Sequence, residues 1–134
     1  MIETKLAVSA TGESLDAQVD PRFGRCAYFL IVDSETFAFE AIPNTAAGAM
    51  SGAGIQAAQT VAEKGVKVVI TGNVGPNAFQ ALSAAGIEIA TGALGTVREA
   101  VSKYNDGELQ EISAPSVRGH FGMRTGKGLG RGRR

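Results

Sequence analysis

The chain has 134 residues, 44% hydrophobic and 19% charged, a balance that indicates one globular domain with a substantial core. A single cysteine excludes an intrachain disulfide and favours a reducing, cytoplasmic location. Because the sequence has no long apolar stretch, we expect no signal peptide and no transmembrane helix. The net charge of zero hides an asymmetry: residues 1–112 hold all 13 acids and seven bases, a charge of −6, whereas residues 113–134 hold six bases and no acid, a charge of +6.

The first half of the chain predicts three strands and a long loop. Residues 4–9, TKLAVS, form a short strand, and residues 10–25 follow as a loop because Gly, Asp and Pro interrupt any regular period. Residues 26–33, CAYFLIVD, are nearly all apolar and predict a central strand that is covered on both faces. Residues 36–42, TFAFEAI, predict a third strand that forms a hairpin with the second.

The second half alternates helices with strands. The expected elements are a helix at 55–64, a strand at 66–71, a helix from Pro76 to a stop at Gly86, a strand at 87–90 and a helix from Val97 to a stop at Gly107. Gly65 and Gly86, each followed by an apolar residue, match left-handed helix stops, and Thr96 with Glu99 matches a capping box.

This order of elements predicts an α/β fold, with a five-stranded mixed sheet and three helices on its faces. Helices between successive strands imply parallel strands with right-handed crossovers, and the hairpin adds an antiparallel part. The loops at 10–25, 43–54, 72–76 and 91–96 then emerge together at the carboxyl edge of the parallel strands. Open α/β sheets usually bind their ligands at that edge.

Glycine-preceded helix ends and two arginines converge on the same edge. Helix N-termini present free amides and positive dipole ends, and arginines add cationic donors, so we expect an anion to bind there. The candidate binding residues are Arg22, Phe23, Gly24, Arg25, Gly52, Gly54, Gly75, Asn77 and Gly95.

Metal ligands and catalytic groups are scarce in the sequence. Cys26 has two interpretations: a free cysteine in a strand is usually a buried packing residue, but the neighbouring Arg25 could lower its pKa and make it a metal-binding thiolate. His120 is a further candidate metal ligand, although no paired spacing accompanies it. The Walker pattern is absent, and GAGIQA at 52–57 matches a dinucleotide fingerprint without a strand directly before it. We therefore do not expect an enzyme.

Residues 113–134 form a basic tail rich in Gly and Arg. Such a composition cannot bury a core, so we expect this tail to be disordered and residues 1–112 to form the single domain. The tail could bind nucleic acid or another anion, or it could serve only as a solubilising terminus.

Three segments resemble the dinitrogenase iron–molybdenum cofactor biosynthesis family: RFGRCAYFLIVD, GAGIQAAQTVAEKGVKVVITGNVGPNAFQAL and GIEIATGALGTVREAVSKYNDGEL. The resemblance covers residues 4–112 in matching order and is to small stand-alone members, similar to the orange-protein branch. It implies a ribonuclease-H-like fold with strand order 3-2-1-4-5. It also implies the binding of a metal–sulfur cluster, either the iron–molybdenum cofactor or its precursor or a molybdenum–copper sulfide cluster, in an anaerobe or archaeon.

One position departs from this family pattern. Cofactor-binding relatives often have a histidine where this sequence has Arg22. Arginine cannot ligate a metal, but it can bind an anionic cluster through charge and hydrogen bonds. We therefore expect a non-enzymatic binder or carrier of such a cluster, with cluster donor or acceptor proteins as partners and no membrane association. The alternative is a nucleic-acid-binding or regulatory module that acts through the tail.

Overall fold

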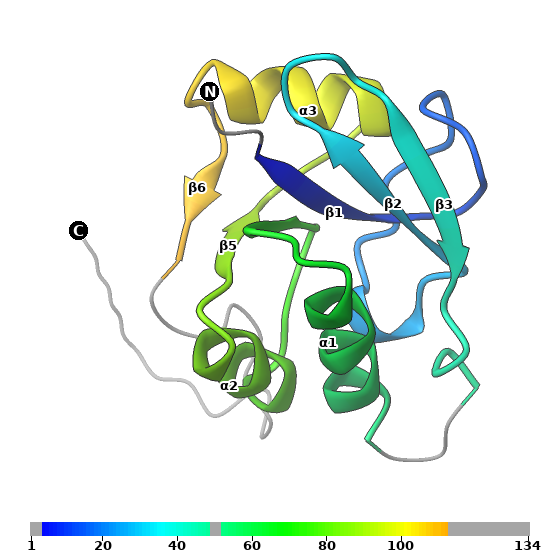
Figure 1. The fold of residues 1–134 in the computed structure, drawn as a ribbon, viewed down its shortest axis with the longest axis vertical. Coiled ribbons are helices and arrows are strands. Elements are labelled where there is room, and N and C mark those ends of the chain that lie inside the picture. Colours follow the sequence, from blue (N-terminus) through cyan, green and yellow to red (C-terminus); the bar gives the residue numbers. More distant parts are fainter. Residues whose placement is uncertain (1–3, 49–51, 113–134) are drawn as a thin grey trace.

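Short apolar runs build one mixed sheet with helices on both faces in the computed structural model, which describes residues 4–48 and 52–112 (Figure 1). The strands are β1 (Lys5–Ala10), β2 (Tyr28–Asp33), β3 (Phe39–Pro43), β4 (Val68–Ile70), β5 (Glu88–Thr91) and β6 (Gln110–Glu111). The helices are α1 (Ala53–Glu63), α2 (Pro76–Ala84) and α3 (Val97–Asn105), and a short 3-10 turn, η1 (Phe23–Arg25), precedes β2.

The sheet has the order β3-β2-β1-β4-β5-β6. β1, β4 and β5 are parallel to one another, while β2 is antiparallel to both β1 and β3. The predicted order of five strands and their directions are thus confirmed. The prediction of five strands in total was wrong, because β6 adds an antiparallel partner to β5. The ribonuclease-H-like description of this fold stays a prediction.

Two apolar cores lie on opposite faces of the sheet. Alternate residues of β2 serve them in turn: Phe29 and Ile31 face the core under α1 and α2, whereas Leu30 and Val32 face the core under α3. This alternation follows from the two-residue period of a strand. The prediction of a central strand covered on both faces is therefore confirmed.

The ends of the elements follow local backbone chemistry. Gly65 and Gly86 have φ angles of 74° and 77°, the left-handed stops that the sequence predicts for α1 and α2. Thr96 and Glu99 form the predicted capping box of α3. Strand β3 begins three residues later than expected, because Phe37 has a positive φ of 63° and closes the turn that leaves β2. In the described part of the chain, no helix is long and apolar enough to cross a membrane.

Candidate anion-binding cleft

A cleft of about 460 Å³ opens at the edge of the sheet where β1 and β4 end. Its walls come from four segments that are distant in sequence: residues 21–25, residues 52–54, Asn73 and residues 75–78. The first of these holds η1, and the second and fourth hold the first turns of α1 and α2. The fold therefore brings two helix N-termini and an arginine-containing turn to one hollow.

Small residues allow these three elements to approach closely. A Cβ atom on Gly24 would lie 3.0 Å from both the Cα and the N of Gly54, and a Cβ on Gly54 would lie 3.1 Å from the Cβ of Ala78. Both distances are shorter than ordinary contacts, and the atoms that Gly24 meets belong to the backbone and cannot rotate away. The narrow spacing of η1, α1 and α2 thus depends on glycine at these positions.

Two of the three glycine-preceded helix ends face the cleft. α1 and α2 follow Gly52 and Gly75, which have no side chain to cap the first amides. At the third helix end, that of α3, the first amides already have hydrogen-bond partners. The N–H groups of Val97 and Arg98 donate to backbone carbonyls at 2.9 Å, and the N–H of Glu99 donates to the side chain of Thr96 in the capping box. Unpaired amides at a helix N-terminus are the groups that bind anions.

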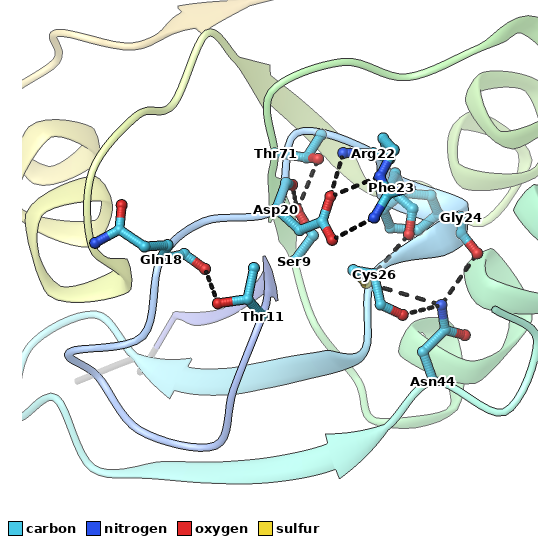
Figure 2. Close-up of polar contacts among 10 residues, drawn as sticks. All are labelled: Ser9, Thr11, Gln18, Asp20, Arg22, Phe23, Gly24, Cys26, Asn44 and Thr71. Atoms are coloured by element: carbon cyan, nitrogen blue, oxygen red, sulfur yellow. Dashed lines mark hydrogen bonds and ion pairs between the residues drawn. The ribbon is translucent and has the colours of Figure 1, made fainter.

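Arg22 stands at the mouth of the cleft and is paired with a carboxylate (Figure 2). Its Nε donates to Oδ1 of Asp20 and its Nη2 donates to Oδ2, each at 3.1 Å. The backbone N–H of Arg22 also donates to Oδ1 of Asp20, at 2.9 Å. Burial alone would raise the pKa of Asp20, but the hydrogen bonds and charge of Arg22 outweigh it and hold that pKa below its ordinary value. Asp20 is therefore ionised and buried, and the exposed side of the Arg22 guanidinium can still contact a ligand.

Arg25 and the turn around it are held by the loop after β3. The guanidinium of Arg25 donates to the carbonyl of Ala47 at 2.9 Å. The buried amide of Asn44 donates to the carbonyls of Gly24 and Cys26 at 3.1 and 2.9 Å (Figure 2). These bonds fix η1 to the loop after β3, so Arg25 reaches the cleft from a turn that is held in place.

Phe23 and Cys26 point into the core. Phe23 is 2% exposed, and its ring centroid lies 5.1 Å from that of Phe29. Cys26 is fully buried, its Sγ lies 3.3 Å from the carbonyl oxygen of Phe23, and it is absent from the described walls of the cleft. Phe23 therefore anchors η1 from below.

A family model described as dinitrogenase iron–molybdenum cofactor matches residues 4–107. The chain belongs to this family. The apo form of the orange protein from Desulfovibrio gigas is 46% identical, covers 84% of this chain and 96% of its own, and superposes with a TM-score of 0.82. A Thermotoga protein described as a NifB candidate is 37% identical, covers 83% of this chain and 95% of its own, and has a TM-score of 0.73. An uncharacterized protein of Methanocaldococcus jannaschii is 32% identical over 98 residues, which is 71% of this chain and 83% of that protein.

Eight of the nine predicted binding residues of this family member line the cleft, all except Gly95. The carbonyl of Gly95 instead accepts a hydrogen bond from the Val19 amide at 2.8 Å, next to the capped end of α3. That the eight residues bind a ligand stays a prediction. His120 and the predicted disordered tail lie outside the described residues.

The structure bears on the two interpretations of Cys26. Burial raises the pKa of the Cys26 thiol to about 12, against smaller opposing effects of hydrogen bonds such as that from Asn44. This direction agrees with the packing interpretation of Cys26. Among residues 4–48 and 52–112, no cluster of three or more His, Cys, Asp or Glu side chains could hold a metal ion.

Several residues that shape the cleft were missed by the sequence analysis. They are Ser9, Asp20, Asn44, Thr71 and Asn73. Asp20 directly precedes Pro21 and Arg22, and an Asp-Pro pair ahead of an arginine was a usable signal of a turn whose carboxylate stays nearby. The others become neighbours only through the pairing of β1 with β4 and through the fold of the loop after β3.

Proposed function

We propose that this protein binds and carries an anionic metal–sulfur cluster, and that the cluster lies in the cleft between η1, α1 and α2. The observation that carries the proposal is the convergence of two uncapped helix N-termini with Arg22 and Arg25 on one hollow, in a member of the dinitrogenase iron–molybdenum cofactor family. The role is that of a carrier and requires no catalytic group.

The chemistry of the cleft suits a sulfide-rich anion. Each helix end carries a partial positive charge of about half a unit, and its free amides can donate to sulfide in the way that they donate to phosphate. Arg22 and Arg25 add charge-assisted hydrogen bonds. The described residues offer donors here rather than a set of metal ligands, so the cluster would be held mainly through its outer sulfur atoms.

Two cluster types fit this proposal. The 46% identity to the orange protein supports a molybdenum–copper sulfide cluster, as the resemblance implies for that branch. The family model supports the iron–molybdenum cofactor or its precursor. In either case a donor protein would supply the cluster and an acceptor protein would receive it. The cytoplasmic location expected from the single cysteine would keep the cluster in a reducing compartment.

Anaerobic loading tests the molybdenum–copper form of the proposal. The purified chain is incubated with tetrathiomolybdate and copper, passed through a desalting column, and examined by visible absorption and elemental analysis. We expect molybdenum and copper to elute with the protein together with a visible band. A colourless, metal-free protein fraction would rule out this form.

A paired set of variants then locates the site. Replacing both Arg22 and Arg25 with alanine should weaken retention of the cluster, because the cationic donors of the cleft are lost. The matched control replaces Arg98 and Lys103, which removes the same charge from α3 on the opposite face of the sheet. If the two double variants retain the cluster equally, the cluster binds somewhere other than the cleft.

A further inference from the structure

We infer that Asp20 is a positioning residue, which fixes the guanidinium of Arg22 at the mouth of the cleft so that Arg22 meets a ligand in one orientation. The effect on binding rests on the proposed function, whereas the fixed orientation of Arg22 can be tested without any ligand.

The contact between the two side chains is unequal. The side chain of Asp20 is 6% exposed and that of Arg22 is 66% exposed, so the carboxylate belongs to the protein interior and the guanidinium to the surface of the cleft. The carboxylate engages Nε and Nη2 of Arg22 with its two oxygens, a fork-to-fork geometry that defines the plane of the guanidinium. The remaining N–H groups of Arg22 face away from Asp20 and stay available to a ligand.

Both backbone groups of Asp20, the N–H and the carbonyl, form hydrogen bonds with Ser9. Its N–H donates to the carbonyl of Ser9 at 2.9 Å, and its carbonyl accepts a 2.6 Å hydrogen bond from the Ser9 hydroxyl. That hydroxyl also lies 2.8 Å from the Oγ1 of Thr71, so the ends of β1 and β4 are linked at this point (Figure 2). These groups are buried, and a buried network whose members are all paired is rigid.

The neighbouring residue is clamped as well. The carbonyl of Pro21 accepts a hydrogen bond from the Asn73 amide at 2.8 Å, and a Cβ on Gly72 would lie 2.7 Å from the Cα of Pro21. The backbone at Asp20, Pro21 and Arg22 therefore has little room to move. A guanidinium tied to such a backbone loses less conformational freedom when it binds a ligand than a free arginine would.

Asp20 has two opposite effects on an anion in the cleft. Its negative charge offsets that of Arg22, so charge alone predicts that Asp20→Asn binds an anion more tightly. Positioning predicts the reverse, because asparagine cannot accept both guanidinium hydrogen bonds and Arg22 becomes mobile. The sign of the change in affinity therefore separates the two explanations.

The experiment compares wild type with Asp20→Asn and with Asp16→Asn. The control removes an equal charge from an exposed Asp–Arg pair, Asp16 with Arg98, whose atoms lie 3.3 Å apart outside the cleft. Binding of the tetrathiomolybdate anion is measured anaerobically by titration. We expect about tenfold weaker binding for Asp20→Asn, the loss of one charge-assisted hydrogen bond, and unchanged binding for Asp16→Asn.

A ligand-free measurement accompanies the titration. In the nitrogen-15 spectrum of labelled arginine, the Nε–H of Arg22 should exchange slowly with water in wild type and Asp16→Asn, and rapidly in Asp20→Asn. If wild type binds and Asp20→Asn binds equally or more tightly, the inference is wrong and the proposed function stands. If wild type does not bind tetrathiomolybdate, the molybdenum–copper form of the proposed function fails. A slow Arg22 signal that persists in Asp20→Asn overturns the inference separately.

Arg22→Lys provides a variant that does not disturb the interior. Lysine keeps the positive charge but lacks the planar fork, and the position is largely exposed, so the fold should survive even if Asp20→Asn unfolds. We expect Arg22→Lys to bind tetrathiomolybdate more weakly than wild type. Equal binding would show that a fixed guanidinium plane has no role.

Discussion

Cys26 and Arg22 lie close in sequence, yet burial gives their side chains opposite chemistry. Cys26 is 0% exposed and faces the core, whereas the side chain of Arg22 is 66% exposed. The sequence places Arg25 beside Cys26, so a lowered thiol pKa was one of two interpretations, but Arg25 reaches toward Ala47 while the thiol points inward. Adjacency in sequence gives the distance between two residues and leaves the directions of their side chains open, which is why the sequence alone could not decide between the two interpretations.

Alkylation tests the buried thiol. Because the thiolate is the reactive form and burial raises the pKa of Cys26 to about 12, iodoacetamide should label the folded protein at least about tenfold more slowly than the urea-unfolded protein at about pH 8. Mass spectrometry of timed samples gives both rates. Equal rates, or faster labelling of the folded protein, would show that Cys26 is accessible and ionised.

The same thiol makes stability depend on pH in the alkaline range. The unfolded chain releases the Cys26 proton near its ordinary pKa of 9.0, whereas the folded protein keeps it until about pH 12, so folding loses stability as the pH rises through this window. We expect the free energy of unfolding in urea to fall more steeply above about pH 9 for wild type than for Cys26→Ala. Parallel curves for the two proteins would contradict the raised pKa.

At the scale of elements, the cleft exists because η1 touches the start of α1. Gly24 and Gly54 supply that contact, since any side chain at Gly24 would meet backbone atoms at 3.0 Å. The sequence identified Gly54 as a site residue through the helix end that it adjoins, and Gly24 through the arginine-containing turn before the second strand. It could not show that they contact each other, because they lie 30 positions apart and meet only in the folded sheet.

Gly24→Ala tests this contact. The added methyl group should force η1 and α1 apart and lower the free energy of unfolding by about 1–3 kcal/mol, the usual cost of overpacking. Gly48→Ala is the matched control, because nothing lies within 4 Å of a Cβ at that position. Urea unfolding of both variants measures the difference. A Gly24→Ala protein as stable as the control would mean that the two elements can separate at little cost.

Some elements could be located from local sequence patterns, and strand β6 could not. Long apolar runs and glycine stops located β2, α1 and α2, because periodicity and backbone freedom are local properties. Strand β6 has only two exposed residues, Gln110 and Glu111, of types that do not favour strands. It forms because β5 offers a free edge, which is a property of the folded sheet.

At the scale of the whole molecule, the described residues already enclose two cores, one on each face of the sheet. The parallel arrangement of β1, β4 and β5 made the carboxyl edge predictable as the ligand edge. The sequence did not show that the cleft lies only on the face of the sheet that α1 and α2 cover. α3 covers the other face, and its capped N-terminus faces the loop at residues 15–17.

Removal of residues 113–134 tests the predicted division of the chain. Since the described residues already form both cores, the shortened chain should unfold within about 4 °C of the full chain, about the shift expected for 1 kcal/mol. Thermal unfolding by circular dichroism measures this difference. A much larger decrease in Tm would show that the tail stabilises the domain.

Amide chemical shifts during an anaerobic titration with tetrathiomolybdate test the binding of an anion in the cleft most directly. A second groove, lined by Phe79, Ser83 and Ile112 among others, serves as an internal control. We expect the amides of Gly24, Gly54 and Asn77 to shift and saturate together while those of the second groove stay constant. Shifts confined to the second groove, or none in the cleft at saturating anion, would contradict this expectation.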